Sequence, residues 1–230
     1  MGATLRNWFD SLDVGEGTNL SRIKESFLDE ISLYPGTSPT FLGYQDYPAP
    51  LCLSLNEVVL YGLPRPNTLL GFGDVLRIDA GLTYEGLTVD SARTFVIGRN
   101  IEAEKALKIA KSAVYCGINQ AIPGKTIGDI SHAIQSHIEW KGYQPCLEIR
   151  GHGTGRALHL PPGIPNYGIP HSGPVIEEGM VLAIEPVISK GVPKLAKLDD
   201  GWQLVNYNQG VIAHWEHTIY VDKDEPEVLT

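Results

Sequence analysis

The sequence has few cysteines, no basic run and no long apolar stretch. Its three cysteines form no Cys-x-x-Cys pair, which favours a reducing compartment over a disulfide framework. With 18 basic and 27 acidic residues the net charge is −9, so the basic surface that nucleic-acid binding needs is missing. No stretch is apolar over the 18 residues that a membrane span needs, and residues 1–13 lack the apolar core of a signal peptide. We therefore expect a cytoplasmic protein with neither nucleic-acid specificity nor a membrane partner.

What the sequence does have is enough apolar residues, 43% of 230, to bury a full core. Helical periodicity begins after Asn19 and again after Thr126, each a suitable N-cap, and a third helix is predicted at about 102–120. Strand-like runs occur between these helices, so the mixed order indicates an α+β fold in a single domain covering residues 1–230. The two capped helices repeat at an offset of 107 residues, which suggests two related halves.

Three expectations concern extended segments and loops. Residues 51–60, 180–188 and 211–221 each read as one continuous strand. Residues 160–175 contain five prolines and no clear period, which predicts an ordered irregular loop that forms a wall or lid.

Residues 75–96 hold two aspartates in a predicted hairpin. Apolar and polar residues alternate on both sides of a turn at Tyr84-Glu85-Gly86. If the chain reverses between Tyr84 and Glu85, Asp79 lies directly opposite Asp90, with Cβ atoms about 4.5–5.5 Å apart, and like charges at that spacing destabilise the pair. The pattern thus predicts a cation between the two carboxylates. The alternative is a pair of surface aspartates.

Three more residues of the metal-ligand type have apolar or glycine-rich neighbours. Glu185 and Glu216 each interrupt an apolar run without an obvious basic partner nearby, although a distant arginine could pair with either. His152 lies among three glycines, where the backbone and the ring can approach a ligand closely. With the two aspartates they offer four carboxylates and one imidazole, a set suited to two divalent cations about 3.5–4 Å apart.

Five motifs follow one another in unbroken order from about residue 14 to the C-terminus. They are Gly43-Tyr44 through Glu57-Val58-Val59, the hairpin from Ile78-Asp79 to Asp90, Gly151-His152-Gly153-Thr154-Gly155, Gly179-Met180-Val181-Leu182-Ala183-Ile184-Glu185-Pro186 and Glu216-His217-Thr218-Ile219. In this order and context they resemble the type I methionine aminopeptidases of metallopeptidase family M24. The resemblance implies the pita-bread fold, whose two pseudo-symmetric α+β halves agree with the 107-residue offset.

The resemblance also implies a role for each site residue. Glu185 would shuttle a proton while a metal-activated water attacks the first peptide bond, and His159 would hydrogen-bond the substrate around that bond. The implied ligands of two divalent ions (Co, Mn, Fe or Zn) are Asp79, Asp90, His152, Glu185 and Glu216. The implied pocket for the methionine side chain, apolar and aromatic as a thioether requires, consists of Phe41, Tyr44, Tyr47, Leu158 and Trp202.

Two departures from the family pattern stand out. Tyr61 occupies the position of a family histidine near the metals, and a phenol cannot reproduce the proton affinity of an imidazole near neutral pH, since the reference pKa values are about 10 and 6.5. We therefore predict reduced or altered activity. At residues 1–13 an atypical segment stands where the family has its first helix, so the N-terminal half is expected to be trimmed.

The leading interpretation is a metalloaminopeptidase that removes the initiator methionine from nascent proteins. The alternatives are a related metallopeptidase with another substrate, such as proline-containing peptides, and a non-catalytic pita-bread binding module. Retention of all five ligands and the aromatic pocket favours the first interpretation, whereas Tyr61 favours the binding module. The expected partner is the N-terminal methionine of a nascent chain, with the ribosome as a candidate partner, and the expected state is a monomer.

Overall fold

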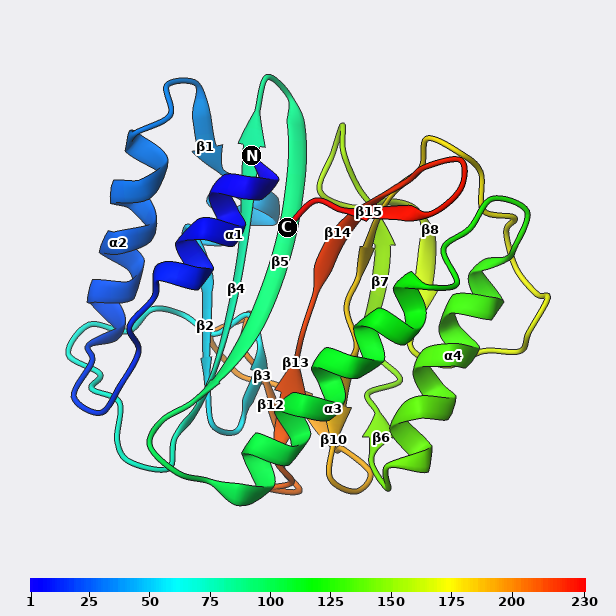
Figure 1. Cartoon of the computed structure of the whole chain (residues 1–230). Coiled ribbons are helices and arrows are strands. Elements are labelled where there is room, and N and C mark those ends of the chain that lie inside the picture. The colour runs from blue at the N-terminus through cyan, green and yellow to red at the C-terminus, as the bar shows by residue number, and fades with distance from the viewer.

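The computed structural model describes residues 1–230, and Figure 1 shows two sets of strands, each covered by a pair of helices. A short 3-10 helix, η1, spans Tyr44–Asp46. The other elements of the first half are α1 Gly2–Ser11, α2 Leu20–Ser32, β1 Thr37–Pro39, β2 Cys52–Leu55, β3 Val58–Leu60, β4 Val75–Tyr84 and β5 Leu87–Val96. Those of the second half are α3 Ile101–Ile118, α4 Ile127–Trp140, β6 Gln144–Pro145, β7 Arg150–Gly153, β8 Leu160–Pro165, β9 Val181–Ile184, β10 Val187–Ser189, β11 Leu195–Lys197, β12 Leu204–Asn206, β13 Ile212–His214, β14 His217–Val221 and β15 Pro226–Val228.

All strand pairs are antiparallel. In the first half, β4 pairs along its whole length with β5 and, on its other edge, with β1 and β2. In the second half, five strands follow the order β15-β14-β9-β7-β8. Two further sheets have three strands each, in the orders β13-β10-β6 and β11-β12-β3. Because β3 pairs with β12, the last of these sheets joins the two halves.

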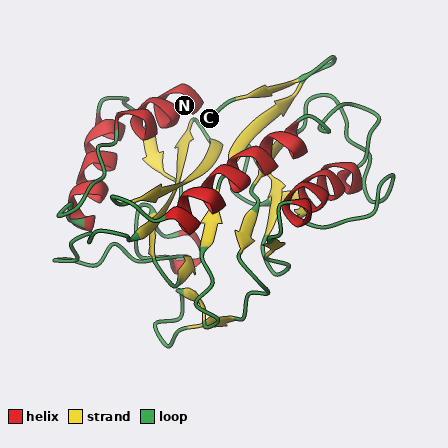
Figure 2. Cartoon of the chain, turned by 60° about the horizontal axis from the view of Figure 1, so that its bottom comes forward, coloured by secondary structure: helices red, strands yellow, loops and turns green.

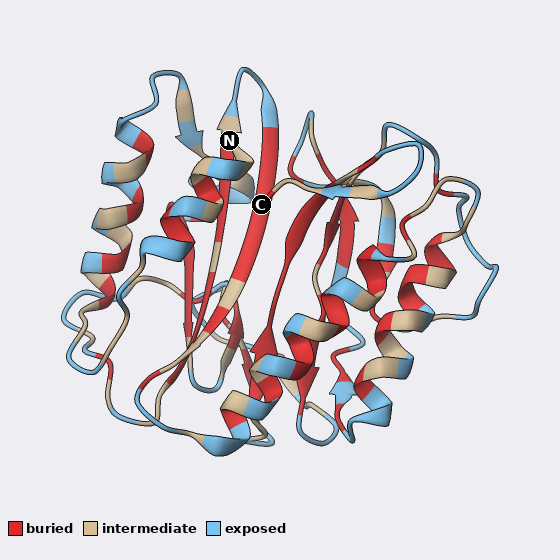
Figure 3. Cartoon of the chain, viewed as in Figure 1, coloured by how far each residue is buried: buried red, intermediate tan, exposed pale blue.

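Each half packs its helices onto one face of its sheet through an apolar core. Figures 1 and 2 show the four α-helices on the same side of the strands, and Figure 3 shows that the buried helix positions face those strands. In the first half, the apolar faces of α1 and α2 cover Ile78, Ala80 and Leu82 of β4. In the second half, α3 and α4 cover Leu182 and Ile184 of β9. The helices therefore do not cover the opposite faces of the same strands.

The two halves meet along β5 and β14. The backbone N–H of Asp90 donates to Thr218 Oγ1, and that hydroxyl donates to the carbonyl of Asp90. The backbone N–H of Glu216 donates to the carbonyl of Ala92. These bonds bring Asp90 of the first half beside Glu216 of the second, although the two residues are far apart in sequence.

The predicted helices and the 107-residue offset are confirmed. The side chain of Asn19 accepts the N–H of Ser21 at the start of α2, and Thr126 forms a capping box with Asp129 at the start of α4. Helices α2 and α4 thus begin 107 residues apart. Both cap residues also form isolated bridges, Asn19 with Leu69 and Thr126 with Val175, so the resemblance of the halves extends beyond the helices.

Several local expectations were wrong. The segment 1–13 does form a helix, α1, which buries Leu5, Trp8 and Phe9 in the core of the first half. The runs 51–60, 180–188 and 211–221 each divide into two strands, with breaks at Asn56-Glu57, Glu185-Pro186 and Trp215-Glu216. Residues 160–165 form strand β8, which tolerates three prolines because it lies at the edge of its sheet. None of the four α-helices has both the length and the apolar character of a membrane-spanning segment.

Candidate metal centre

The hairpin places both aspartates on one face, although not directly opposite each other. Glu85 and Gly86 form the turn, both with positive φ (50° and 76°), so Tyr84 pairs with Leu87. In this register Asp79 faces Ala92, and Asp90 faces Gly81. The predicted direct pairing was therefore wrong by two residues. Because side chains alternate with a period of two, a shift of two keeps both carboxylates on the same face as diagonal neighbours.

A tight cluster forms where β5, β7 and β14 converge. One ligand atom each from Asp90, His152 and Glu216 lie within 4.8 Å of one another. All three residues are buried, with exposures of 4%, 8% and 2%. His152 is held in place by the pairing of β7 with β9, where it faces Ala183. Its Nδ1 lies 2.9 Å from the carbonyl oxygen of Gly153, which leaves Nε2 for the cluster.

Glu185 lies at the break between β9 and β10 and completes the group. Its Oε1 is 3.7 Å from Nε2 of His152, and its Oε2 is 3.8 Å from Nε2 of His214. The carboxylate thus lies between two imidazoles, one on each oxygen. Its side chain is 12% exposed, so it is largely desolvated but still reachable from the strand face opposite the helices, which is called the cleft below.

The electrostatics of the cluster fit bound cations. Burial raises the pKa of all four acids, and the charge of Asp79 raises the pKa of Asp90, Glu185 and Glu216 further. Burial lowers the pKa of His152 to about 4, so the imidazole is neutral and can act as a ligand. Asp79 Oδ1 and Glu216 Oε1 are buried without a hydrogen-bond partner. Four buried carboxylates, two of them with an oxygen that has no partner, are what a divalent pair neutralises, so these residues fit the group.

The five residues predicted for the side-chain pocket form one contiguous cluster beside the acids. Phe41, Tyr47 and Leu158 are buried, and Tyr44 and Trp202 pack against them. Tyr47 and Trp202 meet edge to face, with ring centroids 5.2 Å apart. Cys52 belongs to the same cluster and faces Asp79 across β2 and β4, so the pocket adjoins the carboxylates.

His159 lies between this pocket and the metal-ligand cluster. Its Nδ1 is 2.8 Å from the hydroxyl of Tyr44. Its ring lies edge-on to that of His152, with centroids 4.3 Å apart. The hydroxyl of Tyr44 therefore fixes the ring, and Nε2 is left for a ligand.

Tyr61 stands at the edge of the cleft with positive φ (58°), a backbone conformation that is strained for an aromatic residue. It is 44% exposed. Partial burial of the phenol raises its pKa, and the negative charge of Glu185 raises it further. The phenol is therefore a neutral hydrogen-bond donor next to the acids.

Sequence reasoning missed two buried residues beneath the site, Arg77 and His214. Arg77 is 1% exposed and donates to the backbone carbonyls of Asn56, Val58 and Ile212. It therefore joins β4 to β3 and β13. Burial and this arginine lower the pKa of His214 to about 3. A polar residue inside an apolar strand was the available signal, but it does not indicate what the side chain faces.

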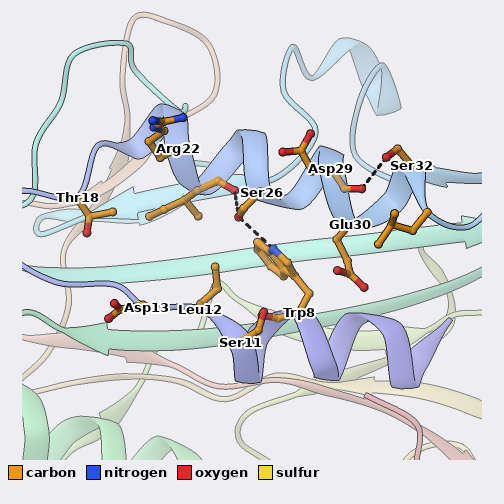
Figure 4. Close-up of a pocket in the computed structure, with 12 residues that line it drawn as sticks. Trp8, Ser11, Leu12, Asp13, Thr18, Arg22, Ser26, Asp29, Glu30 and Ser32 are labelled. Carbon is orange, nitrogen blue, oxygen red and sulfur yellow. Dashed lines mark hydrogen bonds between the residues drawn. The ribbon is translucent and has the colours of Figure 1, made fainter.

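A separate groove of about 600 Å³ lies between α1 and α2, lined by residues such as Trp8, Ser26 and Glu30 (Figure 4). The indole N–H of Trp8 donates to Ser26, which in turn donates to the carbonyl of Ile23. Trp8 and Ser26 are thus paired within the protein. None of the predicted site residues lines it.

Comparison with known proteins assigns the family. The sequence profile described as metallopeptidase family M24 matches residues 3–223. The chain belongs to this family. A methionine aminopeptidase of Clostridium acetobutylicum is 37% identical over 213 residues, which cover 92% of this chain and 84% of the relative.

Solved structures agree with the family assignment. The crystal structure of a methionine aminopeptidase from Thermotoga maritima matches with a TM-score of 0.93 and 34% identity, covering 100% of this chain and 91% of that one. Prolidase from Pyrococcus furiosus matches with a TM-score of 0.75 at 20% identity, covering 100% of this chain and 60% of that chain, and shows the shared fold alone. This family member is thus a metalloaminopeptidase with the pita-bread fold, as the motifs predicted.

Proposed function

We propose that this metalloaminopeptidase removes the initiator methionine from nascent proteins through a dinuclear centre. The observation that carries the proposal is the cluster of Asp90, His152 and Glu216, drawn from both halves, with Glu185 against His152 and a contiguous aromatic pocket beside them. The proposed ligands are Asp79, Asp90, His152, Glu185 and Glu216. Two divalent ions, when bound there, would supply Lewis-acid polarisation of the scissile carbonyl and lower the pKa of the attacking water.

In this proposal, two residues of the chain itself transfer the proton and orient the substrate. Glu185 is nearly buried and its pKa is raised, so its carboxylate can take a proton from the attacking water and pass it to the leaving amine. His159, oriented by Tyr44, is placed to donate a hydrogen bond from Nε2 to the substrate near the scissile bond. Burial keeps Glu185 in a low-dielectric setting where such bonds are strong.

The pocket accounts for the choice of the first side chain. Phe41, Tyr47 and Leu158 form a buried apolar surface, and Tyr44 and Trp202 border it. An unbranched thioether adapts to such a surface and makes favourable contacts between sulfur and aromatic rings. We therefore propose methionine as the residue released, consistent with the names of the relatives at 36–40% identity.

Tyr61 is proposed to modulate this activity rather than to abolish it. Its neutral phenol can donate a hydrogen bond near Glu185, but it cannot accept and return a proton near neutral pH. We also propose that the protein acts in the cytoplasm as a monomer on nascent chains, with the ribosome as a candidate partner.

The test is release of methionine from Met-Ala-Ser by purified protein. The protein is stripped with a chelator and then restored with Mn or Co. Metal-dependent release is the expected result, with a Pro-containing peptide such as Ala-Pro as the specificity control. Absence of methionine release in the presence of bound metal, or preference for the Pro-containing peptide, would contradict the proposal.

A further inference from the structure

His214 is a buried histidine that the proposed reaction does not yet use. It ends strand β13, and its side chain is 1% exposed. Its backbone is fixed across the junction of the halves, since its N–H donates to Thr94 Oγ1 and its carbonyl accepts from the same hydroxyl. The position of the imidazole is therefore set by both halves of the fold.

The ring nitrogens of His214 are both without a hydrogen-bond partner. A neutral imidazole carries one N–H donor, and a buried donor normally has an acceptor. The nearest acidic oxygen is Oε2 of Glu185, 3.8 Å from Nε2. This separation is longer than a hydrogen bond, but such contacts in active sites often shorten when the site binds its ligands.

The two oxygens of Glu185 thus have different neighbours. Oε1 faces His152, itself a proposed ligand, whereas Oε2 faces His214, which is not within the tight cluster. We propose that His214 is a positioning residue for Glu185, whose Nε2–H donates to Oε2 and thereby holds the carboxylate plane in the orientation that the metal centre needs. This inference rests on the proposed function, because it requires that Glu185 is a ligand.

A positioning role predicts effects on metal affinity and on the chemical step. Partners that hold a ligand from outside the coordination sphere are typically worth about 10–100-fold in affinity or activity. Loss of the donor should weaken metal binding and lower kcat, since Glu185 also moves the proton. KM should change little, because His214 does not contact the substrate pocket.

The experiment compares Mn affinity, measured by titration calorimetry without substrate, and kcat and KM in the parent, His214→Leu, His214→Phe and His214→Gln. Leu and Phe remove the donor, and Phe retains a ring if Leu is too unstable to purify. Gln keeps an N–H donor of similar reach. Ser189→Ala is the matched control, because Ser189 is also buried without a partner, on the strand paired with β13, and lies away from the site.

The expected result is Mn binding weakened about tenfold or more in His214→Leu or His214→Phe, near-parent affinity in His214→Gln, and no change in Ser189→Ala. The visible spectrum of the Co-loaded His214→Gln protein should match that of the parent. Parent-like affinity in the Leu and Phe variants would overturn the inference, and so would a changed Co spectrum in the Gln variant, which indicates direct ligation. A parent protein that binds no Mn would instead refute the proposed metal centre, and the inference with it.

Discussion

The two faces of the same strands follow opposite rules. On the helix-covered face of β4, Ile78 and Ala80 are fully buried in an apolar core. On the other face, Asp79 between them carries a buried oxygen without a partner. The second half repeats this contrast, with Ile184 in its core and Glu185 next to it in the cleft. One face is built for stability and the other for chemistry that costs stability.

Removal of one acid of the cleft should have the largest effect, with a loss of activity and a gain of stability in chelator. We expect Glu216→Gln to lower methionine release about a thousandfold or more, because the stabilisation that metal ions provide is worth several kcal/mol. In chelator the same variant should be more stable than the parent, since it lacks a buried carboxylate that the neighbouring acids also repel. Activity assays and urea unfolding measure the two effects. The control is Glu227→Gln on the exposed edge strand β15, and a fully active Glu216→Gln protein would disprove the metal centre.

A core substitution should instead lower stability and leave activity unchanged. Ile134 of α4 is fully buried against the second sheet, so Ile134→Ala should lower the free energy of unfolding by about 2–5 kcal/mol. Its kcat, measured where the variant is still folded, should match that of the parent. A variant with parent stability and reduced kcat would mean that the two faces are not separable in this way.

The pH dependence of stability should also separate the faces. In chelator, burial raises the pKa of Asp79 from 3.8 to about 7 and that of Glu216 in the same direction. A raised folded-state pKa means that these acids contribute stability below about pH 4, which is lost as the pH rises through the folded value. The stability advantage of Glu216→Gln over the parent should therefore grow from pH 5 to pH 8.

The buried histidines have the opposite slope below about pH 6.5, but both proteins contain them, so the difference between variant and parent isolates the acids. Urea unfolding in chelator at each pH gives this difference. A constant difference across the range would show that the pKa of Glu216 is not raised in the folded protein.

The smallest expected effect concerns the edge of the cleft. Tyr61→His should raise kcat by about tenfold, because an imidazole can exchange a proton near neutral pH and the phenol cannot. Tyr34→His, at an exposed position after α2, is the control. Unchanged turnover in Tyr61→His would remove the idea that this residue limits the activity.

The sequence predicted the separation of the faces better than it predicted the register. The turn was placed one residue early, so Asp79 was paired with Asp90 instead of Ala92. The prediction of neighbouring carboxylates survived because a shift of two residues preserves the face. Turn geometry depends on the left-handed conformations of Glu85 and Gly86, and alternation alone does not reveal which residues adopt them.

The hydrophobic periodicity of the sequence did not predict the strand breaks or the contacts between residues that are distant in sequence. The run 180–188 was read as one strand although Pro186, which cannot donate to a strand ladder, was an available signal for the break between β9 and β10. His214 was overlooked because its nearest acid, Glu185, is distant in sequence and lies just before β10, the strand that pairs with β13. The family motifs supplied the candidate ligands, whereas the contacts of Arg77 and His214 beneath them depend on how the halves meet.

The central claim is that the acids of the cleft form a site for two cations. The most direct test is native mass spectrometry of the full chain after stripping and addition of Mn, with Glu216→Gln beside it. We expect two Mn ions per parent chain and fewer in the variant. A parent chain that retains no Mn under conditions in which it is folded would contradict the account.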